Sequence, residues 1–112
     1  MDMNKKIPAR IRKLMKGLKA GLVRVYGDRL KGVYLYGSYA RGDYRPGSDV
    51  DVMILLSDYQ NYWEELRRTS ELISNVSLEY DLLVSRIFMT EAKWQQPDTP
   101  LLRNIHQDGQ LA

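Results

Sequence analysis

The 112-residue sequence contains no cysteine and a single histidine, His106. The chain therefore has neither a disulfide nor a thiolate metal site, and one histidine by itself does not make a multi-histidine centre. Any bound metal must be held by oxygen, from the 14 aspartate and glutamate residues. The longest apolar run, residues 52–56, is far shorter than the roughly 20 residues of a membrane-spanning helix. No hydrophobic stretch follows the first residues, so we expect no secretory signal and a cytoplasmic protein.

The chain has the size of one domain. It has a mass of 13.1 kDa, and 44% of its residues are hydrophobic and 28% charged, which permits a modest core. No internal repeat, low-complexity tract or Pro/Gly-rich linker interrupts it. Residues 1–112 are therefore predicted to form a single domain.

The net charge of +3 is unevenly distributed along the chain. The first 28 residues contain eight Lys and Arg against two Asp, whereas the remainder contains nine against twelve acidic residues. The apolar residues of the basic segment recur with the spacing of one buried helix face, which leaves the cations on the other faces. A solvated helix face is the first interpretation, and a surface that attracts an anionic partner is the second. Nucleic acid is disfavoured, because no aromatic stripe is interleaved with the cations.

Periodicity and turn residues predict alternating helices and strands. Helices are expected at residues 8–26, 38–42, 59–75 and 99–107, with a short one between Thr90 and Pro97; strands are expected at 33–36, 49–56 and 78–87. Three strands cannot bury both faces of a large sheet. The predicted fold class is therefore α/β (α+β), with a small mixed sheet of three or slightly more strands and helices packed mainly on one face.

Two aspartates, Asp49 and Asp51, lie at the start of the predicted second strand. Strand alternation places both carboxylates on one face, with Cα atoms roughly 6.5–7 Å apart. Placing two unpaired charges beside a sheet lowers the stability of the fold unless a cation neutralises them. Oxygen ligation suits Mg²⁺, which is usually completed by water and substrate phosphates. Asp81, in the predicted third strand, offers a further carboxylate, and Glu79 on the same face is the reserve candidate.

Gly37 and Ser38 end the first predicted strand and open a short helix. Glycine lets a backbone approach phosphate closely, and the N–H groups at a helix start favour anions. A Gly-Ser turn alone is weak evidence, as is an Asp-x-Asp alone, because turns and helix caps use the same residues. Together they predict a phosphate-binding turn ahead of a pair of metal-binding carboxylates.

Residues 37–42 (GSYARG) and 48–51 (SDVD) resemble the motif of the DNA polymerase β-type nucleotidyltransferases. Ten residues separate the Gly-Ser pair from the Asp-x-Asp, the spacing found in the minimal nucleotidyltransferases (MNT) that act as antitoxins. The resemblance extends over about residues 7–109 and implies a polymerase β-like core. The end of the chain, residues 110–112, departs from the pattern because it lacks the further strand-like residues expected there.

The resemblance implies how a nucleotide binds. Gly37 and Ser38 would hold the β- and γ-phosphates of a nucleoside triphosphate, expected to be ATP. Arg41 and Arg45 would neutralise phosphate charge, against the alternative that these arginines only pack or pair. Ser48, beside the Asp-x-Asp, is also assigned to nucleotide binding.

The resemblance also implies a catalytic centre with two Mg²⁺ ions. Asp49 and Asp51 would ligate metal that bridges the phosphates, and Asp81 would help to bind the second ion and activate the acceptor hydroxyl. Such a pair of ions, roughly 3.5–4 Å apart, stabilises the attacking and leaving oxygens of an in-line displacement.

The implied activity is transfer of a nucleotidyl group, expected to be AMP, to a hydroxyl. The family often pairs with a small helical HEPN protein, a toxin that its MNT partner modifies on tyrosine. A protein adenylyltransferase acting as the antitoxin of such a pair is therefore the first hypothesis. The alternatives are a catalytically silent antitoxin or binding subunit that acts by contact, and a transferase for aminoglycoside-type small molecules that needs a partner subunit.

Overall fold

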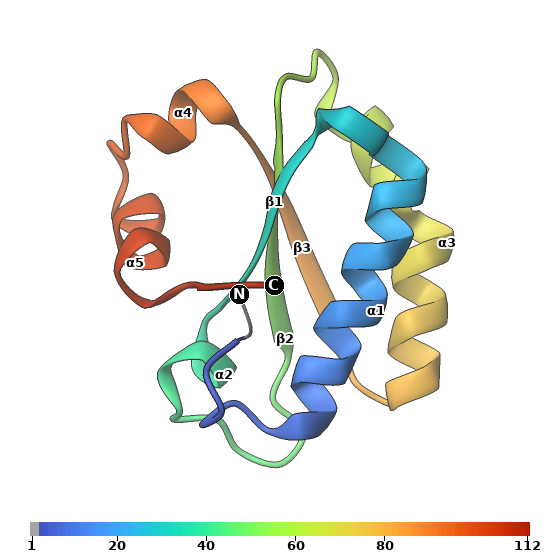
Figure 1. Ribbon diagram of the computed structural model, residues 1–112, viewed down its shortest axis with the longest axis vertical. Helices are drawn as coiled ribbons and strands as arrows, with labels where there is room; N and C mark the ends of the chain where they lie inside the picture. The colour runs from blue at the N-terminus through green and yellow to red at the C-terminus, as the bar shows by residue number, and fades with distance from the viewer. Residues whose placement is uncertain (1–2) are drawn as a thin grey trace.

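A four-stranded mixed sheet forms the centre of the protein in the computed structural model, which describes residues 3–112 (Figure 1). The strand order is β3-β2-β1-β4. Strand β1 (Leu30–Tyr36) runs antiparallel to both β2 (Val50–Leu56) and β4 (Gln110–Leu111), whereas β2 runs parallel to β3 (Val84–Thr90). No helix of the described chain is both long and apolar enough to cross a membrane.

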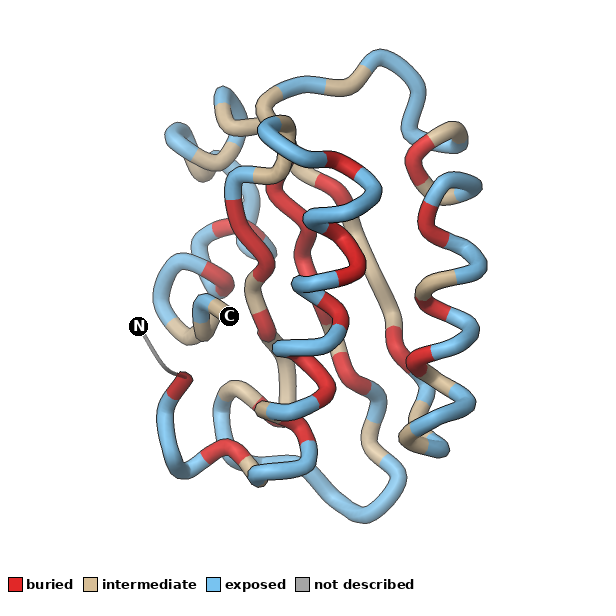
Figure 2. Tube along the Cα trace, turned by 45° about the vertical axis from the view of Figure 1, so that its right-hand side comes forward, coloured by how far each residue is buried: buried red, intermediate tan, exposed pale blue. Residues whose placement is uncertain are grey.

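Two long helices, α1 (Ala9–Tyr26) and α3 (Tyr62–Tyr80), cover one face of this sheet. Figure 2 shows the buried positions of α1 recurring along its sheet-facing side, as the apolar periodicity predicts. The helices approach each other closely at Gly21, where a Cβ atom would overlap the side chain of Leu72. A short 3-10 helix, η1 (Gly27–Arg29), joins α1 to β1.

The opposite face carries the shorter helices α4 (Glu91–Gln95) and α5 (Pro100–Asp108). Alternation along β2 sends one set of side chains to the core under α1 and α3 and the other set, including Met53 and Leu55, to a smaller cluster with Leu102 and Ile105 of α5. Asp51 has the same parity as Met53 and Leu55. It therefore projects on the α5 side, beyond the end of the smaller cluster.

The predicted fold class is confirmed, and several strand bounds are corrected. The first strand begins at Leu30 rather than at residue 33, and the third ends at Thr90 rather than at residue 87. The end of the chain does form a strand, because Gln110 and Leu111 pair with β1 and add a fourth strand. The third strand begins at Val84 rather than at residue 78, since α3 continues through Tyr80. Asp81 then ends the helix in the left-handed conformation, with φ 52°, which Asp tolerates better than most residues.

Candidate active site

The turn after β1 brings the chain against a carboxylate of β2. Gly37 has φ 76° and ψ −153°, a backbone conformation that side chains other than hydrogen rarely allow. A Cβ atom there would also overlap the Asp51 carboxylate, and it would lie 3.2 Å from Asp51 Cγ. Glycine is therefore required both by the backbone and by the close approach to Asp51.

The short helix α2 (Ser38–Arg41) begins immediately after this glycine. Its first internal hydrogen bonds run from Arg41 N to Gly37 O (3.0 Å) and from Gly42 N to Ser38 O (2.8 Å). The N–H groups of the residues before Arg41 have no acceptor within the helix, as at every helix start. They lie beside the Ser38 hydroxyl, where an anionic oxygen would find several donors together.

A cavity of about 330 Å³ opens over the end of β1, between α2 and α5. One wall comes from the predicted site and the other comes from α5. The lining residues are Tyr36, Gly37, Ser38, Arg41, Asp51, Leu101, Asn104, Ile105 and Asp108. The cavity thus combines a glycine turn that opens a helix, an arginine and a strand-borne carboxylate, which is a suitable arrangement for a phosphorylated ligand.

The Asp51 carboxylate is the electrostatic centre of this cavity. Burial raises its pKa, the neighbouring Asp49 raises it further, and the positive charge of Arg41 opposes both effects. Arg41 also forms a 3.3 Å ion pair with the exposed Asp43. A half-buried carboxylate whose ionisation is disfavoured by burial and by a neighbouring aspartate forms a site whose charge a cation would balance.

Tyr36 lies opposite Asp51 in the β1–β2 register and shares the cavity wall with it. Burial, then the charge of Asp51 and the proximity of Tyr62 raise the pKa of Tyr36 to about 12. The phenol therefore stays protonated at neutral pH and can donate a hydrogen bond into the cavity. The sequence pattern places Tyr36 in the first strand and indicates no role for it in the site.

The structure gathers four of the predicted site residues and separates three. Gly37, Ser38, Arg41 and Asp51 line one cavity. Asp49 directly precedes β2 and is exposed; it acts on Asp51 through its charge and does not line the cavity.

Ser48 and Asp81 also lie outside the lining. The Ser48 hydroxyl accepts a hydrogen bond from Arg45 N (2.8 Å) and so closes the turn before β2. Asp81 is exposed at the end of α3, and its predicted position on a strand is wrong. The β3 residue opposite Asp51 is Ser85, which brings no carboxylate.

The donor set fits a divalent cation at two carboxylates rather than three. Within residues 3–112, no three His, Asp or Glu side chains lie close enough to hold a metal together. Two predicted ligands, the carboxylates of Asp49 and Asp51, are still available for a metal ion. Mg²⁺ is commonly bound by one or two carboxylates together with water and substrate phosphates. The chemistry of the site therefore fits Mg²⁺ delivered with a nucleotide.

Four further lining residues, Leu101, Asn104, Ile105 and Asp108, come from α5 and were not predicted to belong to the site. Leu101, Asn104 and Asp108 follow one another at spacings of three and four residues and so share one helix face. A signal was present in the sequence, because the polar Asn104 and the acidic Asp108 lie on the face next to the buried Leu102 and Ile105. Nothing local indicated that this helix would lie against the Gly37 turn.

Comparison with known proteins identifies the family. The model of the nucleotidyltransferase domain matches residues 13–111. The chain belongs to the nucleotidyltransferase domain family. It is 40% identical over 74 residues to "Putative protein adenylyltransferase MJ0141" of Methanocaldococcus jannaschii, an alignment that covers 66% of this chain and 74% of that protein. The predicted family and the predicted enzyme class, a nucleotidyltransferase, are confirmed.

Two solved structures share the fold. A "putative nucleotidyltransferase" from Sulfolobus solfataricus superposes with a TM-score of 0.66 at 24% identity, over 96% of this chain and 86% of that one. The complex of a tri-AMPylated HEPN toxin with its MNT antitoxin, from Shewanella oneidensis, contains a chain that superposes with a TM-score of 0.50 at 18% identity, over 87% of this chain and 70% of that one. At these identities the likeness shows the fold alone.

Proposed function

We propose that this nucleotidyltransferase transfers AMP from ATP, with Mg²⁺, to a hydroxyl group on a partner protein in the cytoplasm, as the antitoxin of a HEPN/MNT pair. The observation that carries the proposal is the cavity in which the Gly37–Ser38 turn meets the Asp51 carboxylate. The name of the Methanocaldococcus relative and the AMPylated toxin in the Shewanella complex support a protein as the acceptor.

Several residues of the cavity, together with the neighbouring Asp49, would bind the nucleotide and its cation. The N–H groups at the start of α2 and the Ser38 hydroxyl would bind the β- and γ-phosphates, and the Arg41 guanidinium would offset their charge. Asp49 and Asp51 would hold Mg²⁺, which when bound neutralises phosphate charge and polarises the α-phosphate. Asn104 and Leu101 of α5 would contact the nucleoside.

The transfer itself exchanges one phosphorus–oxygen bond for another. The acceptor oxygen bonds to the α-phosphorus, the bond to the β-phosphate oxygen breaks, and pyrophosphate leaves. The hydroxyl proton passes to a carboxylate, for which we propose Asp81. The hydrogen bond from Val50 N to Leu83 O (2.9 Å) brings the segment after Asp81 against the start of β2, so both acids precede paired parallel strands at the same end of the sheet.

The test is transfer of label from ATP labelled at the α-phosphate, with Mg²⁺, to the product of a neighbouring gene. We expect label on a tyrosine of that protein, about 100-fold less label with Asp51→Asn, and a similar loss with Asp81→Asn. The Asp81→Asn variant should still bind ATP within twofold, because its role is on the acceptor side. Unchanged transfer by Asp81→Asn would leave Asp81 as a helix cap only.

Two other outcomes select the alternative functions. If only small molecules such as aminoglycosides are labelled, the protein is still a nucleotidyltransferase, but its acceptor is a small molecule rather than a protein. Tight association with the neighbouring protein and no label on any acceptor would favour an antitoxin that acts by contact. The absence of a carboxylate opposite Asp51, where β3 has Ser85, is the observation that makes this second candidate worth testing.

A further inference from the structure

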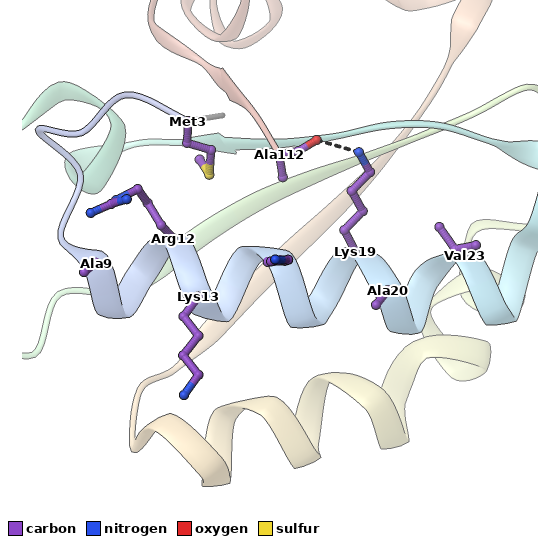
Figure 3. Close-up of a pocket in the computed structure, with 9 residues that line it drawn as sticks. Met3, Ala9, Arg12, Lys13, Lys19, Ala20, Val23 and Ala112 are labelled. Carbon is purple, nitrogen blue, oxygen red and sulfur yellow. Dashed lines mark hydrogen bonds between the residues drawn. The ribbon is translucent and has the colours of Figure 1, made fainter. Parts of the chain in front are cut away.

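A second cavity lies away from the active site, along the outward side of α1 (Figure 3). It has a volume of about 700 Å³. Its lining residues are Met3, Ala9, Arg12, Lys13, Lys16, Lys19, Ala20, Val23 and Ala112, which we call the α1 groove. Nucleotide binding as proposed above uses none of them.

The spacing of the groove residues follows one face of the helix. Successive groove residues are separated by four, three, four and three positions, in the order Ala9, Lys13, Lys16, Ala20 and Val23. This spacing is typical of a helix face that packs against another helix. From Ala9 to Val23 this face is about 21 Å long. The other sides of α1 are already occupied, by the sheet and by α3.

Along α1 itself, the cations of the groove lie between Ala9 at one end and Ala20 and Val23 at the other, and Met3 and Ala112 lie beside the middle (Figure 3). Arg12, Lys13, Lys16 and Lys19 supply four cations, and no acidic residue is part of the lining. Arg12 and Lys19 donate hydrogen bonds to the backbone oxygens of Ile7 (3.0 Å) and Ala112 (2.8 Å). Within residues 3–112, none of the four forms an ion pair with an Asp or Glu side chain.

The apolar positions are small or partly exposed. Ala9 and Ala20 are exposed and leave room for another backbone to come close, and Val23 is 49% exposed. Exposure of the Val23 side chain to water is unfavourable in free energy. Packing against an apolar side chain of a partner would remove this surface from water and so favour binding.

We propose that the α1 groove docks an amphipathic helix of a partner protein, with acidic side chains facing Lys13 and Lys16 and apolar side chains facing Ala20 and Val23. Within the proposed function this partner is the protein that accepts AMP; the docking site itself does not depend on that assignment. A nucleic acid would use the cations and leave the apolar ends unused, and no aromatic side chain in the lining offers a base a stacking surface.

Fluorescence anisotropy with a labelled 18-residue helical peptide tests the proposal. The peptide carries two Glu residues in the middle of one face and Leu residues at the ends of that face; a second peptide has the same composition in scrambled order. We expect the ordered peptide to bind at least tenfold more tightly than the scrambled one. The Lys13→Glu/Lys16→Glu variant should weaken binding of the ordered peptide at least tenfold.

Two variants separate docking from a general attraction between charges. Arg24→Glu/Lys31→Glu makes the same change of charge at exposed residues outside the groove and should alter the affinity less than threefold. Ala20→Gln adds bulk without charge and should weaken binding about fivefold by preventing the close approach. Circular dichroism and thermal unfolding confirm that each variant is folded.

Three results would overturn the proposal: equal loss in both charge-reversal variants, no saturable peptide binding, or tighter binding of an 18-nucleotide single-stranded RNA than of the ordered peptide. Binding of ATP with Mg²⁺ is measured on the same samples. If the protein binds ATP but not the peptide, the docking proposal is contradicted and the proposed function is not. If it binds the peptide but not ATP, the proposed function is contradicted and the docking proposal is not.

Discussion

At the scale of single residues, the active site depends on a carboxylate held where its charge is unfavourable. Asp51 is half-buried, and both burial and Asp49 raise its pKa. Between the ordinary carboxyl pKa of 3.8 and this raised value, the folded protein keeps a proton that the unfolded chain has lost. Stability therefore falls as the pH rises through that range. The ionised Asp51 carboxylate therefore lowers the stability of the fold at neutral pH, and its charge is available to bind a cation.

The Asp51→Asn variant should lose function and gain stability. It keeps the size of the side chain and removes the charge, so we expect the thermal unfolding temperature to rise relative to the wild type at pH 7.5. The difference should shrink at pH 3.5, below the ordinary carboxyl pKa of 3.8, because the wild-type carboxyl is then mostly protonated in both states. Thermal unfolding at the two pH values measures this. A variant less stable than the wild type at pH 7.5 would contradict the electrostatic account.

Gly37→Ala should destabilise the fold and abolish binding of ATP. The substitution places a side chain at φ 76° and against the Asp51 carboxylate, and such strain costs about 1–3 kcal/mol. Gly47→Ala is the matched control, because Gly47 has φ 82° and open space around its Cβ position. Both variants should lose stability by denaturant unfolding, and only Gly37→Ala should lose ATP in calorimetry. Retained ATP binding by Gly37→Ala would remove the turn from the site.

At the scale of elements, α5 has two roles. Its buried side, Leu102 and Ile105, covers the second face of the sheet, and its other residues form a wall of the cavity. Thr99 begins the helix, since its hydroxyl accepts a hydrogen bond from Leu102 N (3.2 Å), and Pro100 occupies the first turn. Strand β4 then ties the end of the helix to β1. The wall is thus held by local capping at one end and by sheet pairing at the other.

Asn104→Ala should weaken ATP binding without affecting the fold. Asn104 is an exposed residue of the cavity wall, and the loss of one neutral hydrogen bond corresponds to about 0.5–1.5 kcal/mol, or roughly twofold to tenfold in affinity. Gln107→Ala, on the same helix and outside the cavity lining, is the control and should bind ATP as the wild type does. Identical affinities for all three proteins would mean that the nucleoside does not reach α5.

At the scale of the whole molecule, charge is separated between the two sites. The cations of the first 28 residues are concentrated on α1, whereas the cavity contains Asp51 and Asp108 with Asp49 nearby. A triphosphate entering this cavity meets carboxylates of the same sign as its own charge. Its binding should therefore depend strongly on a cation.

Binding of ATP and of Mg²⁺ should be coupled. We expect calorimetry to show ATP binding at least tenfold more tightly with Mg²⁺ than without it, and Mg²⁺ binding weakly in the absence of ATP. A tenfold coupling is about 1.4 kcal/mol and must be reciprocal. In Asp51→Asn the coupling should shrink, because one of the two carboxylates proposed to bind Mg²⁺ is lost. Equal ATP affinity with and without Mg²⁺ would contradict a site that binds the two together.

The sequence by itself determined the parts of this protein that depend on neighbours in the chain. The apolar periodicity of α1, the strand-ending turn at Gly37 and Ser38 and the alternation that gives Asp51 its face all follow from local geometry. The motif and its spacing likewise indicated the family, which the domain match over residues 13–111 confirms.

Only the tertiary structure decided which residues from distant segments meet. The pairing of Gln110 with Leu35 and the approach of Asn104 to the Gly37 turn join segments more than 60 residues apart. Asp81 is an example of a prediction that failed for this reason. The segment around it was compatible with both helix and strand from its sequence, and in the folded protein α3 continues through Tyr80. Such contacts gain their free energy from burial and strand pairing between remote segments, and a local pattern does not encode which segments will pair.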